Sequence, residues 1–354
     1  MLQWKLYPAQ DFEHWRFAWD SLNQSCCGSA LLESRFVSLL LHYFGNDKIR
    51  LAIGQRTKSI VAMALIEPGA RGTWSTFQPS QAPLGLWLSM PDLEQDRAVQ
   101  SLMRILPWPA LLFGIVQQDP SFVPRLAQTS HLQTLDYIRT ARIRTTGTFE
   151  DYWAARGKNL RHNLKRQRNR LEREGVNLRL DVACQPDVMA EAIADYGRVE
   201  SAGWKNTSGT AISQHNVQGA FYLNLLKTYA KTGDTLVYRY FYNDRVVACD
   251  FCILGNGVIN WLKTTYDESE TTSSPAALLR QSSFEQVFAD SRINMIEFYG
   301  PVMDWHTKWS DDIRAMYHVN VYRFAWLAKL HGRKHQIMTL NDLRAAKILS
   351  SETD

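Results

Sequence analysis

A run of basic side chains is the feature of this sequence that most directly indicates a binding chemistry. From residue 156 to residue 173 the chain holds eight Lys and Arg residues against the single Glu172. Apolar residues recur through this region at spacings of seven, four and seven, which is one face of a helix expected over residues 150–174. Three of the basic residues form a stripe on the remaining arc: Arg161, Lys165 and Arg168. Such a face suits the phosphates of coenzyme A, of a nucleic acid or of an acidic carrier protein, and a solvated helix has the same pattern.

A strand-to-helix junction lies further along the chain, at residues 266–278. Ser274 suits the N-cap position and Pro275 the first helical position. The small side chains of Ala276 and Ala277 leave the first backbone N–H groups of the helix open. A helix start of this kind can hold a pyrophosphate through its free N–H groups and its dipole, although any capped helix has a similar sequence.

Two ionisable residues lie within apolar stretches that are expected to be strands. Asp250 lies within residues 246–253, and Lys263 lies within residues 258–266. Burying a charge is costly unless the charge is paired or lines a polar cavity. The two side chains therefore either form one structural ion pair or line a cleft in which a carboxylate with a raised pKa serves as a base.

Further ionisable residues follow the end of a strand at Gly300. They are Asp304, His306 and Lys308. Catalytic groups often lie at strand ends in α/β sheets, and a loop anchored by Trp305 and Trp309 is the structural alternative. Glu200 with Lys205 makes another acid–lysine combination, at the end of a helix. Because buried ion pairs seldom stabilise a core, we expect these acid–lysine pairs to converge on one polar pocket near Tyr266.

Several classes of protein are disfavoured by what the sequence lacks. The longest apolar runs are about seven residues, whereas a membrane-spanning helix needs roughly 20, and we read no signal peptide. Cys249 and Cys252 have no second Cys or His pair at zinc spacing, so we expect buried structural thiols and no metal. The G-x-S-x-G, Walker, Rossmann and HExxH motifs are also absent. With a net charge of +5 and 45% hydrophobic residues, the chain reads as a soluble, cytoplasmic protein.

Hydrophobic periodicity and turn residues divide the chain into two mixed α/β units. The first holds strands, helices and a buried strand at residues 110–116, and a connector at residues 129–146 leads to the basic helix. The second reads as a strand, two helices, an antiparallel meander of three strands, a helix and two more strands, the last at residues 317–324. This order is typical of a mixed sheet and not of a doubly wound parallel one.

Five motifs of the second unit resemble, in the same order, those of GNAT-type acetyltransferases of the CelD-like (cellulose or exopolysaccharide biosynthesis) family. They are residues 149–166, residues 200–205, residues 262–267, Ser274-Pro275, and Gly300 with Asp304, Lys308 and Trp309. The resemblance spans about residues 149–324 and is weaker at residues 36–85. The family is related to the Fem peptidyltransferases, which also have a tandem arrangement.

The resemblance implies an α/β (α+β) fold of two tandem GNAT-like domains with mixed, mostly antiparallel sheets. We expect an N-terminal domain at 1–145, a C-terminal catalytic domain at 146–335 that includes the basic helix, and a polar tail at 336–354. The chain departs from the family at Pro275-Ala276, where many relatives carry Pro-Gly. It also lacks the Gln/Arg-x-x-Gly-x-Gly/Ala phosphate loop of ordinary acetyltransferases and the helical arm of some Fem enzymes.

The implied activity is transfer of an acyl group, an acetyl group in the first instance, to an amine or hydroxyl of a sugar, glycan precursor or small molecule. Acyl-CoA is the expected co-substrate, with no tightly bound cofactor, and acyl-carrier protein or aminoacyl-tRNA are alternative donors. Backbone N–H groups at the end of the strand at residues 258–266 would stabilise the oxyanion. A carboxylate of Glu200, Asp250 or Asp304 would take the proton.

The remaining site residues are expected to bind the two substrates. Lys263 and Lys308 are expected at the catalytic centre together with these carboxylates. Their ammonium groups would hold the acceptor or the donor phosphates. The residues expected to contact substrate are Trp204, Lys205, Tyr266, His306 and Trp309. The residues expected to contact donor phosphates are Arg161, Lys165, Arg168, Ser274, Ala276 and Ala277. Two other functions stay open: a tRNA- or polyanion-binding protein without catalysis, and a catalytically inactive accessory subunit associated with a polysaccharide machinery.

Overall fold

The computed structural model describes residues 2–201, 212–213 and 216–331. The described chain forms two compact units. The first unit runs to Arg139 and resumes at Arg314, and the second unit is Thr140–Ile313. The chain therefore leaves the first unit within strand β7 (Leu132–Arg144) and returns to it within strand β13 (Asp312–Tyr322).

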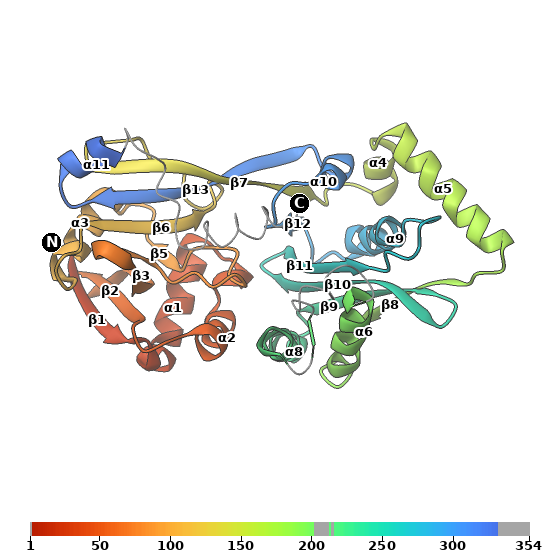
Figure 1. The fold of residues 1–354 in the computed structure, drawn as a ribbon, viewed down its shortest axis with the longest axis horizontal. Helices are drawn as coiled ribbons and strands as arrows, with labels where there is room; N and C mark the ends of the chain where they lie inside the picture. The colour runs from red at the N-terminus through yellow and green to blue at the C-terminus, as the bar shows by residue number, and fades with distance from the viewer. Residues whose placement is uncertain (1, 202–211, 214–215, 332–354) are drawn as a thin grey trace. The chain divides into compact units, whose positions relative to one another are not determined.

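The first unit contains most of β7 and β13, together with a set of earlier elements and one terminal helix (Figure 1). These are β1 (Gln3–Pro8), α1 (Phe12–Cys26), α2 (Ser34–Phe44), β2 (Arg50–Arg56), β3 (Ser59–Pro68), β4 (Thr73–Thr76), β5 (Trp87–Ser89), α3 (Gln95–Ile105), β6 (Leu112–Gln118) and α11 (Ala325–His331). The second unit begins with the end of β7. It continues with α4 (Phe149–Ala154), α5 (Lys158–Arg173), β8 (Leu178–Ala183), α6 (Met189–Ser201), α8 (Val217–Ala230), β9 (Thr235–Tyr242), β10 (Arg245–Gly255), β11 (Val258–Tyr266), α9 (Pro275–Ala289), β12 (Met295–Phe298) and α10 (Asp304–Trp309).

The two units share one topology. The strand order is β1-β2-β3-β4-β6 in the first and β8-β9-β10-β11-β12 in the second. In each unit, antiparallel strands are followed by one parallel pair of strands, and a helix connects the two strands of that pair. In the first unit, residues 73–75 of β4 pair with residues 112–114 of β6. In the second unit, residues 258–260 of β11 pair with residues 295–297 of β12. The expected fold class, tandem α/β units with mixed and mostly antiparallel sheets, is confirmed.

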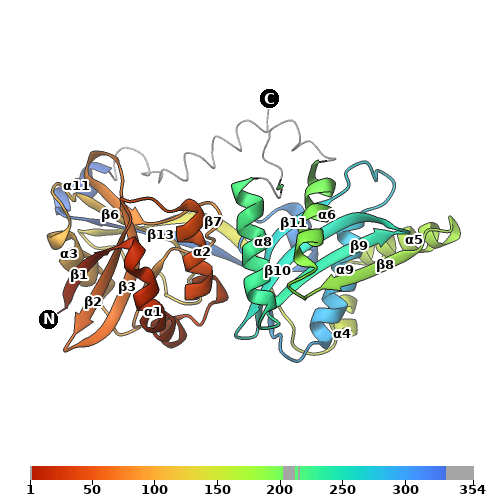
Figure 2. The ribbon, with the colours of Figure 1, turned by 90° about the horizontal axis from the view of Figure 1, so that it is seen from below.

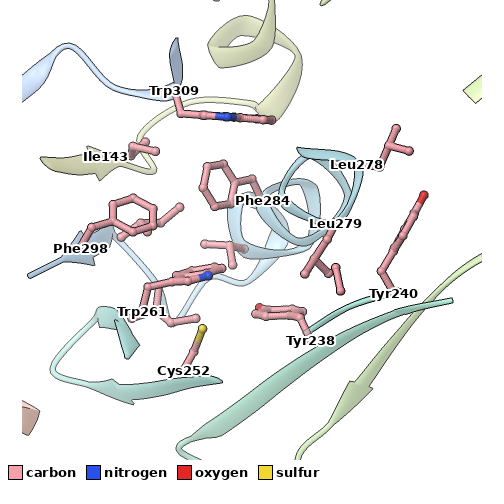
Figure 3. Packing of buried hydrophobic residues seen from close by; sticks show 14 of the residues in the cluster. Ile143, Tyr238, Tyr240, Cys252, Trp261, Leu278, Leu279, Phe284, Phe298 and Trp309 are labelled. Atoms are coloured by element: carbon pink, nitrogen blue, oxygen red, sulfur yellow. The ribbon is translucent and has the colours of Figure 1, made fainter. Parts of the chain in front are cut away.

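Helices cover both faces of the sheet in the second unit. Helices α6 and α8 contact β10 on one face, and α9 contacts β9, β10 and β11 on the other (Figures 1 and 2). The core beneath α9 is aromatic: Phe284 of α9 contacts Trp261, Phe298 and Trp309 (Figure 3). Tyr238 stacks on Trp261 with 5.6 Å between ring centroids. Rings of this size bury large apolar areas and fix the position of α9 against the strands.

Three local expectations differ from the structure. The single helix expected over 150–174 is two helices, because the chain turns extended at Gly157, the N-cap of α5, and glycine is a poor helix former. The connector expected at 129–146 contains the 13-residue strand β7, in which Tyr137, Ile138, Thr140 and Ile143 are residue types that favour a strand. The last strand begins at Asp312, and from Arg314 it belongs to the first unit, whereas the sequence placed residues 146–335 in one domain. No helix of the described residues is long and apolar enough to cross a membrane.

Candidate active site

A break in strand β11 creates the candidate site. Phe251 of β10 pairs with Lys263, while the next residue, Cys252, pairs with Trp261, so Leu262 forms a β-bulge in β11. Strand β11 also pairs with β12 only through Val258–Asn260, although it continues to Tyr266. From Trp261 onward the edge of β11 that faced β12 is therefore free of that strand. Bulges and parted strands of this kind leave backbone groups available to a bound molecule.

Asp250 lies under α9, beside this break. Its side chain is buried and accepts a 2.8 Å hydrogen bond from the indole N–H of Trp261. Burial raises the pKa of Asp250 to about 6, and the charge of Arg280 and the Trp261 hydrogen bond only partly oppose that rise. A carboxyl with its pKa near neutrality can exchange a proton under ordinary conditions. Asp250 thus has the chemistry expected of a base.

Arg280 of α9 is the second charged residue on this face, and the sequence analysis missed it. Its side chain is 4% exposed, and its guanidinium carbon lies 3.8 Å from the centroid of the Trp305 ring. Burial lowers the pKa of Arg280, and the charge of Asp250 opposes that effect. The signal that could have found it is a cation that directly follows the apolar run Ala276–Leu279 in an expected helix, since a charge on a buried helix face is costly unless it is paired.

His306 occupies the first turn of α10. Its Nδ1 accepts a 2.9 Å hydrogen bond from the backbone N–H of Met303, and its ring stacks on Trp305 with 3.5 Å between centroids. Burial, with the nearby charge of Arg280, lowers the pKa of His306 to about 4. The imidazole is therefore neutral near pH 7.

A second polar cluster lies on the opposite face of the sheet, under α6 and α8. The ammonium of Lys263 lies 5.7 Å from the ring centroid of Tyr222 on α8. The carboxylate of Glu200, at the end of α6, accepts a 2.7 Å hydrogen bond from the backbone N–H of Ile212. The hydroxyl of Tyr196 donates to the carbonyl of Thr264 at 3.0 Å, which ties α6 to the freed part of β11.

The expected convergence of three acid–lysine pairs on one pocket is not what the described residues form. Asp250 and Lys263 point to opposite faces, because Lys263 is paired in register with Phe251, the neighbour of Asp250, and side chains alternate along a strand. Asp304 and Lys308 are exposed on α10. Trp204 and Lys205 lie outside the described residues.

Two of the aromatic residues expected to bind substrate have different positions. Trp309 is buried in the core, where it contacts Trp153 and Phe284, so it supports α9 and α10 instead of lining a cleft. Tyr266 is 46% exposed at the end of β11. Of the pair, only Tyr266 is placed to meet a ligand.

The basic helix α5 contacts the loop before α9 and α9 itself. The side chain of Gln167 accepts a 2.8 Å hydrogen bond from the backbone N–H of Ser274, and Arg170 donates to the carbonyl of Thr272. Arg168 reaches Gln281 at 3.4 Å and Ser282 at 3.5 Å, both in α9. Helix α5 is thus fixed beside the start of α9, and Gln167 is a positioning residue that the sequence analysis missed.

The stripe of three basic residues is only partly free. Arg161 donates from Nε to the carbonyl of Arg156 at 3.0 Å, whereas Lys165 is exposed. Lys165 lines an open hollow in the surface. Its other lining residues are His162, Arg166, Asn169, Glu172 and Arg173.

The start of α9 offers less to a pyrophosphate than the sequence indicates. The N–H of Ser274 is bonded to Gln167, and the side chain of Ser274 makes no capping bond. The N–H groups of Ala277 and Leu278 both donate to the carbonyl of Ser274. Among the described residues this leaves the N–H of Ala276 as the free donor of the first turn.

Comparison with known families identifies the second unit. Residues 158–307 match the family described as the acetyltransferase (GNAT) domain. These residues are therefore similar to a GNAT acetyltransferase domain. The matched residues contain the break in β11, both polar clusters and all of α5, and the activity class of the matched family is acyl transfer. The CelD-like family in particular is not distinguished by this match.

Solved structures of low sequence identity share the fold along most of the chain. FemX has a TM-score of 0.56 at 8% identity, with 89% of this chain and 98% of FemX covered. The C-terminal domain of a putative lysylphosphatidylglycerol synthetase from Agrobacterium fabrum has a TM-score of 0.54 at 13% identity, with 92% and 96% covered. L-PGS from Bacillus licheniformis has a TM-score of 0.50 at 13% identity, with 87% and 91% covered. A comparison with curated proteins finds no match.

Proposed function

We propose that this protein transfers an acyl group, an acetyl group in the first instance, from a thioester such as acyl-CoA to an amine or hydroxyl of a sugar, a glycan precursor or a small molecule. The observation that carries the proposal is the break in β11. A bulge at Leu262 and the parting from β12 after Asn260 leave a strand edge that a thioester can occupy. The GNAT domain supplies the reaction class.

The reaction is direct attack of the acceptor on the acyl carbonyl. The acceptor nitrogen or oxygen forms a bond to the carbonyl carbon, and the oxyanion accepts hydrogen bonds from N–H groups on the freed edge of β11. The tetrahedral intermediate then collapses, the carbon–sulfur bond breaks, and the sulfur leaves as a thiolate, which takes a proton from solvent. The acceptor's proton passes to a carboxylate, directly or through one water.

Asp250 is the carboxylate best suited to that role among the three that the sequence offered. Its pKa of about 6 lies near the operating pH, and the Trp261 hydrogen bond fixes its orientation. Asp304 is exposed to solvent, which leaves it a weaker candidate. Glu200 is buried on the other face of the sheet, beside the Tyr222 that Lys263 also approaches, so it cannot take a proton from an acceptor bound next to Asp250.

Donor phosphates are assigned to the α5–α9 junction. Lys165 and Arg168 of α5 lie on the helix that Gln167 fixes beside Ser274, and the N–H of Ala276 is the free donor nearby. The combination of cationic side chains with a helix N-terminus suits a phosphate. The chain lacks the phosphate loop with which ordinary acetyltransferases bind coenzyme A, so acyl-carrier protein is kept as an alternative donor. Its acidic surface would meet the same basic side chains.

A Fem-like, aminoacyl-tRNA-dependent transfer is the alternative that a specific observation favours. The chain shares its fold with FemX and with a domain named for lysylphosphatidylglycerol synthesis, and it presents a helix rich in Lys and Arg. A tRNA acceptor stem carries closely spaced phosphates that such a helix can contact. A non-catalytic polyanion-binding or accessory protein is the remaining alternative.

Donor consumption by the purified full chain tests these proposals. The protein is incubated separately with acetyl-CoA, longer acyl-CoAs, acyl-loaded carrier protein and charged tRNA, each with amino sugars and small amines, and products are read by mass shift. We expect a product with an acyl-CoA, and less with Asp250→Asn. A product with charged tRNA alone would favour the Fem-like alternative. A folded protein that consumes no donor but binds tRNA with a steep salt dependence would leave polyanion binding as the function.

The cellular setting follows from the donor and is part of the proposal. An acyl-CoA-dependent enzyme would act in the cytoplasm, and a sugar acceptor would associate it with a polysaccharide machinery. Cell fractionation, with pull-down of the tagged full chain, tests both points. Recovery outside the cytoplasmic fraction would contradict the placement.

A further inference from the structure

Arg280 combines deep burial with a side chain that has no hydrogen-bonding partner among the described residues. Its Nε is enclosed and unpartnered, and no described carboxylate lies within ion-pair distance of its guanidinium. The nearest compensating charge, that of Asp250, acts through space only. A buried cation left in this state destabilises the fold unless something pairs with it. Such a group is retained where a ligand supplies the missing partner.

The geometry fixes the guanidinium and leaves its edge available. The plane lies over the Trp305 ring at 3.8 Å, and stacking of this kind restrains a guanidinium without using its N–H donors. Nε is the enclosed and unpartnered nitrogen of the group, and with 4% of the residue exposed the Nη edge is the part left to meet a ligand. Two parallel N–H donors on one edge match a carboxylate or a phosphate.

The position of Arg280 places that edge at the reacting end of the site. Trp305 contacts Phe298, the last residue of β12, at 5.7 Å between centroids, and Phe298 contacts Trp261 of β11 at 5.7 Å. Trp261 in turn donates to Asp250 of β10. Arg280 therefore lies where β11 and β12 have parted, beside the proposed proton acceptor.

We propose that Arg280 binds a carboxylate or phosphate group close to the reacting acyl carbon, so that this enzyme acts on an anionic acceptor. Donor phosphates are assigned to the α5–α9 junction, and the part of an acyl-CoA that adjoins the thioester is uncharged, so the anion near Arg280 belongs to the acceptor or to the acyl chain. The identity of the anion as an acceptor group rests on the proposed acyl transfer, whereas the anion site itself does not.

Anion binding is tested without turnover. Arg Nε–H signals of the full chain are followed by NMR during titration with sodium acetate and with inorganic phosphate, at ionic strength held constant with chloride. The Arg280 signal is assigned by its loss in Arg280→Met. We expect a saturable shift of the Arg280 signal and no comparable shift for Arg179, which also lies over an aromatic ring, at 3.9 Å from Phe241, but is about half exposed. An Arg280 signal that neither anion moves would overturn the proposal.

Variants at Arg280 separate a binding role from a structural one. Replacing an unpaired buried charge by an isosteric apolar side chain is expected to leave the Tm in chloride unchanged or higher, and to abolish the rise in Tm that acetate gives the wild type. Arg280→Lys keeps the positive charge but loses the two parallel N–H donors, so acetate should raise the Tm of this variant less than it raises the Tm of the wild type. Arg179→Met is the matched control and should behave as wild type. If Arg280→Met lowers the Tm in chloride and keeps the full acetate response, Arg280 is structural.

Steady-state kinetics decide whether the anion that Arg280 binds belongs to the acceptor or to the acyl chain. With acidic acceptors, such as a uronic acid amine or an amino acid, Arg280→Met should raise the acceptor KM about tenfold or more, the loss expected for a bidentate charge-assisted pair, with little change in kcat. Neutral acceptors should show no comparable rise in KM, and assay well above pH 6 keeps Asp250 ionised although the variant loses the Arg280 charge that lowers its pKa. A change confined to succinyl or malonyl donors would place the anion on the acyl chain and overturn the acceptor assignment. If no donor is turned over while the NMR and Tm responses still depend on Arg280, the anion site stands and the proposed acyl transfer fails.

Discussion

Trp261 donates its indole N–H to the carboxylate of Asp250 at 2.8 Å, between two adjacent strands and beneath α9. The bond joins the residue that immediately precedes the β-bulge of β11 to the buried carboxyl of β10. Any change in the position of the bulge is therefore transmitted to Asp250. This coupling of strand geometry to a titratable group is the basis of the first prediction.

Asp250→Asn should lower turnover while the protein stays folded. Asn keeps an oxygen that can accept from Trp261 but cannot take a proton, so we expect kcat/KM to fall at least roughly tenfold, about 1.4 kcal/mol of transition-state stabilisation. In the wild type, kcat/KM should rise with pH through about 6 as Asp250 ionises. The pH–rate profile measures both effects. A profile that is flat between pH 5 and 7 would contradict the assignment.

The free energy of unfolding of the wild type and that of Asp250→Asn should depend differently on pH. The folded-state pKa of Asp250 is raised above its ordinary value of 3.8, so the folded state binds the proton more tightly. The wild type therefore loses stability as pH rises from about 4 to beyond 6, by up to roughly 3 kcal/mol from this group. Asp250→Asn should lack that component, as denaturant unfolding at pH 4.5 and pH 7.5 would show.

Lys263→Ala should lower turnover at least roughly tenfold, while Asp304→Asn changes it less than about twofold. Lys263 lies over Tyr222 on the face that also holds Glu200, next to the bulge, whereas Asp304 is exposed on α10. Steady-state kinetics of the two variants, with circular dichroism as a check of folding, gives the comparison. An equal loss in both would restore the idea of one shared site.

Charge reversal on the basic helix should act on the donor. The double variant Arg161→Glu with Lys165→Glu is expected to raise the donor KM several-fold with little change in Tm, because Lys165 is exposed and opposite charge repels phosphate. Lys231→Glu, an exposed lysine at the end of α8, is the matched control. The effect should weaken as salt is added. Donor kinetics identical to wild type would leave α5 as solvated surface.

His306 should stay neutral down to about pH 4. Burial and the charge of Arg280 lower its pKa, so its imidazole signals in an NMR titration should move near pH 4 and not near 6.5. A depressed histidine pKa means that the unfolded chain binds the proton first. Stability is therefore lost as pH falls from about 6.5 toward 4. Titration of His306 near its ordinary pKa would mean that the Met303 turn is open to solvent.

Much of the architecture could be predicted from the sequence because it depends on local pattern. The strands β9, β10 and β11 have alternating or continuous apolar runs bounded by turns at Asn243 and at Asn256-Gly257, so the antiparallel meander of three strands was predicted, and the strand expected at residues 258–266 coincides with β11. The burial of Cys249 and Cys252 followed from the same runs. The break between α4 and α5 was missed because Gly157 interrupts a pattern that is otherwise helical on both sides.

By itself, the sequence determined the mixed α/β class, the order of elements in the second unit and the basic face of α5, since each depends on periodicity within a short segment. Only the tertiary structure decided which charges meet. Asp250 and Lys263 are close in register yet face opposite helices, because strand alternation and the bulge at Leu262 set their directions. Arg280 gained its role from Trp305 and Asp250, which lie 25 and 30 residues away in the sequence. Spacing along the chain carries no information about such contacts, because packing of α9 on the sheet creates them.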